Sequence, residues 1–416
     1  MTKSVVNRYI DRAISYPPFI GEDASDDLRL VVVIPCFKEE AIITTLEDLL
    51  KSQATKSSVE VIIVVNDGHS TSPDIISFND LTFDELQKWS ATHSTPTIKF
   101  FPIRIKGLPK KYAGVGLARK VGLDEGVRRL KQVEQEEGIL ICLDADSRVP
   151  DNYLSTIEDH FFRYPKYVGT AIHFEHPIEG ENFESRIYES IIQYELHLRY
   201  FIDMQRKLNL PFAIHTVGSS MAVRSNAYCA VGGMNKRKAG EDFYFFHKFV
   251  KYGPVGEIYE TCVIPSPRIS DRVPFGTGKA VGDLMQDKVW YTYHPKSFEV
   301  LANVLGNLKI AFNDGIESLF INVDKGVQDF FVMQDIEEKW QEIKSNTGDW
   351  NSFYKRFFHW FDAFLFMKYL HYKRDMYYPN ISLEEALKMA YPTLPYHNLK
   401  ESLIAFRQMD KTRSMD

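Results

Sequence analysis

The stretch from Gly138 to Pro150, GILICLDADSRVP, is the most informative for the fold. Its first residues, up to Leu143, form a short and continuous apolar run, which is typical of a strand buried on both faces. Two carboxylates follow at once, on Asp144 and Asp146. In open α/β sheets ligands bind beyond the carboxyl ends of the strands. The stretch therefore predicts a central strand that ends at a binding site.

The same kind of signal recurs on both sides of this strand. Apolar, β-branched runs predict strands at Leu28–Pro35, Val59–Val65, Thr97–Arg104, Gly138–Leu143, Ser219–Arg224 and Val255–Ile264. Helical spacing predicts helices at Glu39–Gln53, Val115–Val133 and Glu181–Leu210, and another that begins at Glu241. Strands that alternate with helices indicate an α/β fold with a mainly parallel sheet flanked by helices.

A change of pattern divides the chain after this region. Residues 265–278, PSPRISDRVPFGTG, are rich in Pro, Gly and charge and have no periodicity, which favours a domain boundary or a mobile loop. Beyond them the spacing is helical, and Ser382 with Glu385 forms a capping box. We expect an α/β domain over residues 1–280 and an α-helical C-terminal domain over residues 281–416. The aromatic run from Phe353 to Tyr378 favours a buried core over a membrane-facing surface.

Composition narrows the class of protein. The 416 residues are 44% hydrophobic and 25% charged, as in folded globular domains, and the net charge of −6 offers no basic field for nucleic acid. Four scattered cysteines without a CxxC pair indicate reduced thiols rather than disulfides or zinc. Neither a signal peptide nor a membrane-spanning run is apparent. We therefore expect a cytoplasmic protein, at most peripheral to the inner face of a membrane.

Three predicted strands end in polar residues, which locates the candidate chemistry. Pro35 is followed by Cys36-Phe37-Lys38-Glu39-Glu40, Val65 by Asn66-Asp67, and Leu143 by Asp144-Ala145-Asp146. An Asp-x-Asp pair suits a hard divalent cation with open positions for phosphate oxygens. The alternative is that the two carboxylates only cap a turn or helix. Acidic ends on two preceding strands favour the metal site.

Five motifs in order over residues 28–278 resemble the family 2 glycosyltransferases, which have the GT-A fold of nucleotide-diphospho-sugar transferases. They are Pro35–Glu40, Val65–Thr71, Gly114–Gly122 with Arg119, Asp144–Asp146, and a downstream pattern formed by Gly218–Arg224, Val231–Gly233 and Gly240–Asp242. The resemblance implies a Rossmann-like GT-A domain. It also implies an inverting, metal-dependent enzyme. The Gln-x-x-Arg-Trp motif of processive synthases is absent, which favours addition of one sugar.

The resemblance also implies roles for single residues. Asp242 would be the general base, with Glu241 beside it, and Asp144 and Asp146 would hold Mn²⁺ or Mg²⁺. The implied donor-binding residues are Pro35, Phe37, Glu39, Asp67, Arg119, Asp144 and Arg272. Phe37 and Asp67 would contact the base and Asp144 the ribose. The donor would be a UDP- or GDP-sugar, and the acceptor a hydroxyl of a carbohydrate or lipid-linked molecule in polysaccharide or glycoconjugate biosynthesis.

Several alternatives remain open at this point. Glu241 can equally serve as a helix N-terminal carboxylate, and Arg119 as a cation on a helix surface. Phe37, Lys38 and Asn66 replace the family's Tyr, Asn and Asp, so the nucleotide is not determined. No histidine is assigned to the metal. The alternative function is a non-catalytic sensor or scaffold for sugar nucleotides, whereas a nucleotidyltransferase lacks its glycine-rich signature loop here.

Overall fold

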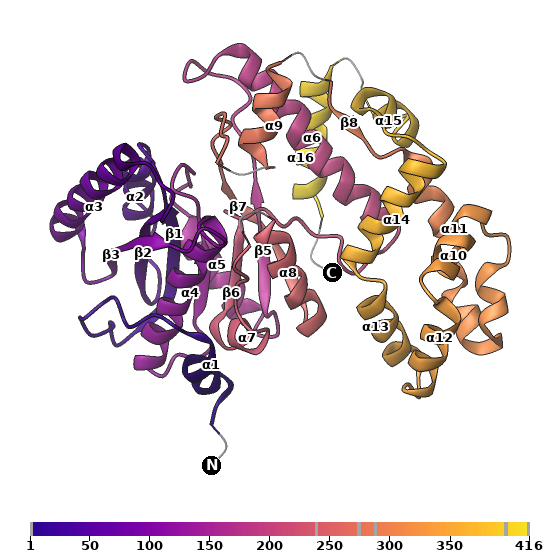
Figure 1. The fold of residues 1–416 in the computed structure, drawn as a ribbon, viewed down its shortest axis with the longest axis horizontal. Helices are drawn as coiled ribbons and strands as arrows, with labels where there is room; N and C mark the ends of the chain where they lie inside the picture. Colours follow the sequence, from indigo (N-terminus) through magenta and orange to yellow (C-terminus); the bar gives the residue numbers. More distant parts are fainter. Residues whose placement is uncertain (1–2, 238–239, 273–275, 287–288, 395–397, 414–416) are drawn as a thin grey trace. The chain divides into compact units, whose positions relative to one another are not determined.

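The computed structural model describes residues 3–237, 240–272, 276–286, 289–394 and 398–413 (Figure 1). The chain forms two compact units. The first comprises residues 1–191, 216–282 and 409–416, and the second comprises residues 192–215 and 283–408. The second unit thus takes a segment from the middle of the chain.

A seven-stranded sheet is the centre of the first unit. Its strands are β1 (Leu28–Cys36), β2 (Ser58–Gly68), β3 (Ile98–Leu108), β4 (Ile139–Cys142), β5 (Gly169–Phe174), β6 (Met221–Arg224) and β7 (Val255–Val263). They lie in the order β3-β2-β1-β4-β6-β5-β7, and only β6 runs antiparallel to its neighbours. The predicted α/β fold with a mainly parallel sheet flanked by helices is confirmed.

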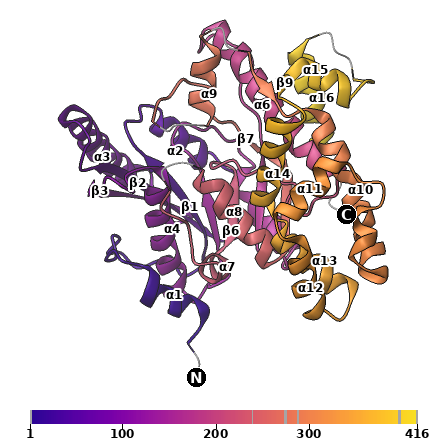
Figure 2. The ribbon, with the colours of Figure 1, turned by 45° about the vertical axis from the view of Figure 1, so that its right-hand side comes forward.

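The helices of this unit are α1 (Val5–Ala13), α2 (Ile42–Leu50), α3 (Pro73–His93), α4 (Val115–Gln132), α5 (Tyr153–Arg163), the first part of α6 (Ser185–Lys207), α7 (Ser225–Ala230), α8 (Glu241–Tyr252) and α9 (Thr277–Leu284). Helices α3 and α4 pack on opposite sides of the strands β1–β3 (Figure 2). A Cβ on Gly122 of α4 would lie 2.4 Å from Val33 Cγ1, so only glycine permits this close approach of helix and sheet.

Most of the predicted elements are present, with small shifts at their ends. Three of the predicted apolar runs form β1, β2 and β4. Every residue of β2 and β4 is buried, as is typical of central strands in a parallel sheet. The sequence pattern did not predict α3, α5 or β5. Strand β5 has only six residues, GTAIHF, in which small and polar side chains interrupt the apolar run.

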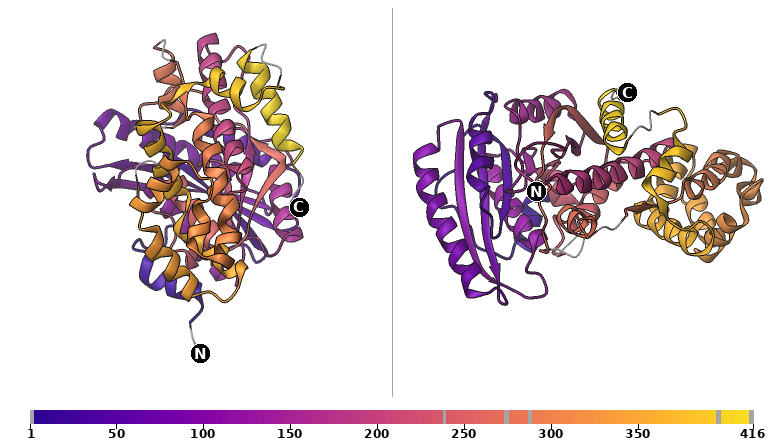
Figure 3. Two further views of the ribbon diagram at one scale, coloured as in Figure 1. Left: turned by 90° about the vertical axis from the view of Figure 1, so that its right-hand side faces the viewer. Right: turned by 90° about the horizontal axis from the view of Figure 1, so that it is seen from above.

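The second unit is almost entirely helical, as the C-terminal pattern predicts. Besides the rest of α6 it contains α10 (Pro295–Asp314), the 3₁₀ helix η1 (Ile316–Phe320), α11 (Lys325–Met333), α12 (Ile336–Ser345), α13 (Trp350–Trp360), α14 (Ala363–Met376), α15 (Leu383–Ala390) and most of α16 (Leu399–Lys411), with a short ribbon of β8 (Tyr291–Thr292) and β9 (Ile381–Ser382). Apart from α6, which is magenta, these helices appear in orange and yellow in Figure 3. The predicted capping box of Ser382 and Glu385 is confirmed at the start of α15.

The predicted aromatic run lies mainly inside the second unit. Phe353, Phe357, Phe361 and Tyr369 are fully buried, and Phe330 and Phe331 of α11 pack against rings of this run. Phe364 is an exception with 45% of its surface exposed. Among the residues that the structure describes, no helix combines the length and the apolar character that crossing a membrane requires.

Candidate active site

The carboxyl ends of β1 and β4 lie side by side and bring the predicted donor-site residues together. These strands are parallel neighbours, with Val33 opposite Cys142. The chain therefore continues from β1 into Phe37 and Glu39 close to the place where it continues from β4 into Asp144 and Asp146. Pro35 lies within β1, and both Pro35 and Phe37 are half-buried, whereas the Glu39 side chain is buried.

Two arginines from the segment after β7 hold the carboxylates at this edge. Arg268 Nε donates to Asp146 Oδ2 at 2.6 Å, and its guanidinium also forms an ion pair with Glu39. Arg272 Nη1 donates to the same Glu39 carboxylate at 3.2 Å, and its Nη2 donates to the carbonyl of Lys38 at 2.7 Å. The two arginines thus contact the carboxylates predicted to bind metal and donor.

A cation accompanies the half-buried Asp146 side chain. Loss of hydration raises the pKa of the Asp146 carboxyl, and the charge of Arg268 opposes this rise. A cationic partner therefore favours the charged form of this carboxylate. Two such oxygen ligands, Asp146 and Asp144, suit Mg²⁺ or Mn²⁺ by their chemistry. The donor set therefore fits a divalent cation.

Arg119 on α4 connects the donor side of the edge with the start of α8. Its Nη2 donates to Asp144 Oδ1 at 2.6 Å, and its Nη1 donates to Glu241 Oε1 at 2.5 Å. The guanidinium is buried, with 2% of the side chain exposed, and its Nε has no hydrogen-bond partner among the described residues. Arg119 is therefore neither a surface cation nor exposed to solvent; it is an internal link between two carboxylates.

Glu241 and Asp242 begin α8 directly beside this link. Gly240, with a φ of 66°, turns the chain into the helix, and the carbonyl of Glu241 accepts a hydrogen bond from Asn235 Nδ2 at 3.0 Å. Burial raises the pKa of Glu241 to about 7 in spite of Arg119, and burial also raises the pKa of the half-buried Asp242. A carboxylate with a raised pKa is suited to accept a proton near neutral pH.

Gly218 lies beside Arg119 and Asp242, where a side chain would be crowded. A Cβ added there would lie 3.1 Å from both terminal nitrogens of Arg119 and 3.3 Å from Asp242 Oδ2. The predicted motif that contains Arg119 therefore meets two parts of the downstream pattern, those with Gly218 and Asp242. A side chain at position 218 would crowd the guanidinium and the carboxylate together.

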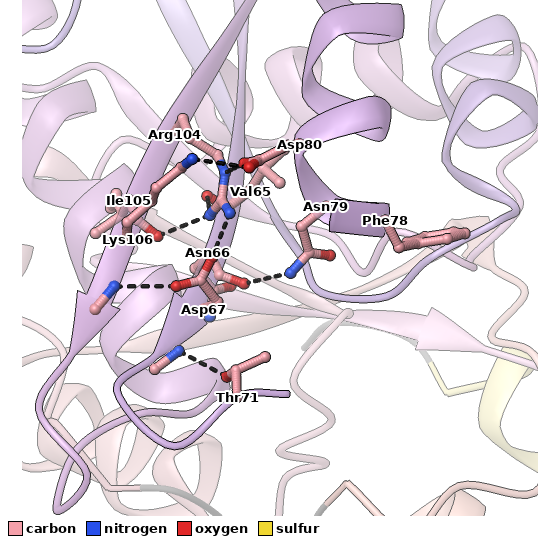
Figure 4. A network of polar contacts seen from close by, with 12 residues as sticks. Val65, Asn66, Asp67, Thr71, Phe78, Asn79, Asp80, Arg104, Ile105 and Lys106 are labelled. Carbon is pink, nitrogen blue, oxygen red and sulfur yellow. Dashed lines mark hydrogen bonds and ion pairs between the residues drawn. The ribbon is translucent and has the colours of Figure 1, made fainter. Parts of the chain in front are cut away.

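Asp67 lies at the end of β2 in a dense polar network (Figure 4). Its carboxylate accepts a hydrogen bond from the backbone N–H of Gly107 at 3.0 Å and forms an ion pair with Arg104. Arg104 also donates to Asp80 Oδ1 at 2.9 Å. Asp67 is thus buried and already fixed by protein partners. Its contact with a nucleotide base stays a prediction.

Arg104 and Asn79 contribute to this edge although sequence reasoning did not single them out. Asn79 of α3 accepts from the backbone N–H of Lys38 at 2.9 Å and donates to the carbonyl of Asn66 at 3.1 Å. It therefore ties the loop after β1 to the end of β2. Neither residue belongs to a motif, and α3 itself was not predicted, so the sequence held no signal for them.

Another group of candidate metal ligands lies at the ends of β5 and β7. His173, Glu175 and Cys262 offer ligand atoms within 4.8 Å of one another, the sole set of three that meets this distance in the described ranges. His173 Nε2 and Glu175 are 2.9 Å apart, and Lys411 forms an ion pair with Glu175 at 2.6 Å. The Glu175 carboxylate thus already has two partners, His173 and Lys411.

Comparison with known families agrees with the site. Residues 139–292, from β4 to β8, match the family described as "Glycosyl transferase family group 2". This segment contains Asp144, Asp146, Gly218 and Asp242. The match bears out the predicted resemblance over this segment of the chain.

Three crystal structures of Staphylococcus aureus TarS residues 1–349 resemble the chain. The first has 16% sequence identity and a TM-score of 0.39, and the match covers 57% of this chain and 60% of that chain. The complex with UDP has 12% identity and a TM-score of 0.37, with 70% of this chain and 68% of that chain covered, and the complex with UDP-GlcNAc has 14% identity and a TM-score of 0.40, with 70% and 75% covered. The chain thus spans less than two thirds of the first of them. No curated protein matches the chain significantly.

Proposed function

We propose that the protein is an inverting, metal-dependent glycosyltransferase that moves one sugar from a nucleoside-diphosphate sugar to a hydroxyl group of an acceptor. The observation that carries the proposal is the link through Arg119, which joins Asp144 of the donor side to Glu241 beside Asp242. Donor and acceptor residues are thereby held in one rigid group, as in-line displacement requires. Residues 1–280 would form the catalytic domain and residues 281–416 a helical C-terminal domain.

Asp242 would act as the general base in this reaction. Its carboxylate takes the proton of the acceptor hydroxyl while the acceptor oxygen attacks the anomeric carbon of the sugar. The bond between the anomeric carbon and the diphosphate oxygen breaks in the same step, and its electron pair leaves with the nucleoside diphosphate. One attack from the opposite side inverts the anomeric carbon.

The donor would lie over the carboxyl ends of β1 and β4. Asp144 and Asp146 would hold Mn²⁺ or Mg²⁺, which supplies positive charge against the diphosphate. Arg268 and Arg272, which contact Glu39 and Asp146 in the structure, would turn toward the diphosphate and neutralise its charge. We propose a UDP- or GDP-sugar as donor, with Phe37 and Asp67 at its base.

The first test is a thermal-shift screen of UDP- and GDP-sugars with and without Mn²⁺. We expect one of these donors to raise the melting temperature of the wild-type protein by a few degrees when Mn²⁺ is present, because a ligand that binds the folded state stabilises it. Asp146→Ala should abolish the part of this shift that depends on Mn²⁺, because it removes the buried carboxylate ligand.

Asp151→Ala is the matched control, since Asp151 is an exposed aspartate shortly after the Asp-x-Asp pair. It should keep the full shift. An Asp146→Ala protein that still shows the wild-type response to Mn²⁺ would contradict the metal assignment. If none of the donors shifts the wild-type protein, with or without metal, the donor class is wrong.

A further inference from the structure

Four exposed cations lie next to the start of α8 and outside the donor-side cluster. Lys110 and Lys111 follow β3, and Lys236 and Arg237 precede α8. We call them the basic patch. In the part of the chain that the structure describes, none of the four forms an ion pair with a carboxylate.

Two aromatic rings lie beside three of these cations. The ammonium groups of Lys111 and Lys236 lie 5.2 and 5.8 Å from the centre of the same ring, that of Tyr112. The Arg237 guanidinium lies 3.9 Å from the ring of Tyr244 on α8. Residues more than a hundred positions apart in the sequence therefore form one patch of positive charge and aromatic surface.

The basic patch is attached directly to the proposed catalytic residues. Asn235 Oδ1 accepts from the backbone N–H of Arg237 at 3.1 Å, and Asn235 Nδ2 donates to the carbonyl of Glu241 at 3.0 Å. A Cβ on Gly116 would lie 2.2 Å from the carbonyl oxygen of Arg237 and 3.1 Å from Glu241 Cβ, so the patch loop packs on the first turn of α4. A molecule bound at the patch is therefore held beside Glu241 and Asp242.

The donor-side carboxylates already have their own cations. Arg268 and Arg272 contact Glu39 and Asp146, and none of the four patch cations takes part in these contacts. In the proposed function, Arg268 and Arg272, which lie outside the basic patch, bind the donor diphosphate. The basic patch is left for the other substrate, the acceptor.

The chemistry of the patch indicates a phosphate group in a polar molecule. Lysine ammonium groups bind phosphate as point charges, and an arginine binds it with paired donors. A lipid surface would also need apolar side chains, but none of the large exposed hydrophobic residues of the described chain lies in residues 106–113 or 234–244. Tyrosine rings beside the cations provide flat faces that sugar or polyol units can contact.

We propose that the acceptor is a phosphate-bearing, water-soluble carbohydrate or polyol, bound through its phosphates at Lys110, Lys111, Lys236 and Arg237. This inference rests on the proposed function and specifies its acceptor. The acceptor hydroxyl lies next to a bound phosphate and reaches the carboxylate of Asp242.

The test is the binding of a fluorescently labelled, short glycerol-phosphate oligomer, measured by anisotropy, with a labelled neutral maltooligosaccharide as comparison. We expect the wild-type protein to bind the phosphate oligomer more tightly than the neutral one, with an affinity that falls as salt increases. The variant Lys111→Gln/Lys236→Gln/Arg237→Gln should bind the phosphate oligomer about tenfold more weakly, since several exposed charge contacts are lost.

The control variant Lys88→Gln/Arg163→Gln/Lys166→Gln removes the same charge from exposed cations elsewhere in the first unit and should bind as wild type does. Equal binding by both variants would overturn the proposal. So would loss of the donor-induced thermal shift in the patch variant, which would assign the patch to the donor. Patch-dependent binding to phosphatidylcholine vesicles with phosphatidic acid, without binding of the oligomer, would also overturn it.

Failure of the proposed function has a different signature. A wild-type protein that binds the phosphate oligomer but neither binds nor consumes a nucleotide sugar would contradict the glycosyltransferase activity. A protein that consumes the donor but treats both oligomers alike would contradict the acceptor class alone.

Discussion

Asp242→Asn is expected to lower kcat by about 10²–10⁴-fold, the usual contribution of a general base, while donor binding remains. The change keeps the shape of the side chain, so the packing against Gly218 and Arg119 should persist. It removes the ability to take a proton from the acceptor hydroxyl. The measurement is the rate of sugar transfer or donor hydrolysis, together with donor affinity by calorimetry.

The same assay across pH adds a second readout of this base. A general base works in its deprotonated form, so the rate should fall as the pH drops through the apparent pKa of the Glu241–Asp242 pair. Since burial raises the pKa of Glu241 to about 7 and also raises that of Asp242, the fall should begin at higher pH than for an ordinary carboxylate. Glu241→Gln removes a neighbouring negative charge and should move the fall to lower pH.

Asp151→Asn is the control for both readouts, because it makes the same chemical change at an exposed site. It should leave the rate and its pH profile unchanged. Wild-type turnover by Asp242→Asn would show that another group accepts the proton, and the base assignment would then be wrong.

Arg119→Met is expected to lower the free energy of unfolding by about 3–5 kcal/mol, because it leaves Glu241 and Asp144 without their shared cation. Glu241 is buried and bears most of this cost, whereas Asp144 keeps 38% of its side chain exposed and contributes less. Domains are commonly stable by about 5–15 kcal/mol, so the loss would be a large part of the total. Urea denaturation measures it directly.

Arg374→Met is the control for this prediction. Arg374 also forms an ion pair, with Asp375, but 36% of the Arg374 side chain and 59% of the Asp375 side chain are exposed. Exposed pairs contribute about 0–1 kcal/mol, so this variant should unfold almost as wild type does. Similar losses in the two variants would mean that the link between Asp144 and Glu241 contributes no special stability.

The sheet could be predicted from the sequence because its central strands are almost fully buried. Strands β1, β2 and β4 contain apolar runs, and their carboxyl ends carry the residues of the site. Strand β5 escaped prediction because its short run includes Thr170 and His173. The predicted positions of Glu39, Asp144 and Asp146 depended only on strand ends, which explains why the structure brings them to one edge.

The partners of these residues could not be predicted in the same way. Arg119 and the carboxylates Asp124 and Glu125 are buried on a helix with almost no exposed face, so the pattern of α4 does not show which of its charges turn inward. The pairing of Asp67 with Arg104 joins two strands, and that of Arg268 with Glu39 joins residues 229 positions apart. Contacts over such separations follow from the fold and leave no local trace in the sequence.

The most direct test of the account is to incubate the wild-type protein with UDP- and GDP-sugars and Mn²⁺ and to measure the nucleoside diphosphate released. The account predicts that one donor is consumed, and that release is strongly reduced in Asp242→Asn and in Asp146→Ala. A wild-type protein that binds such a donor tightly but releases no nucleoside diphosphate, with phosphate-bearing or neutral acceptors, would contradict the account and leave a sugar-nucleotide sensor.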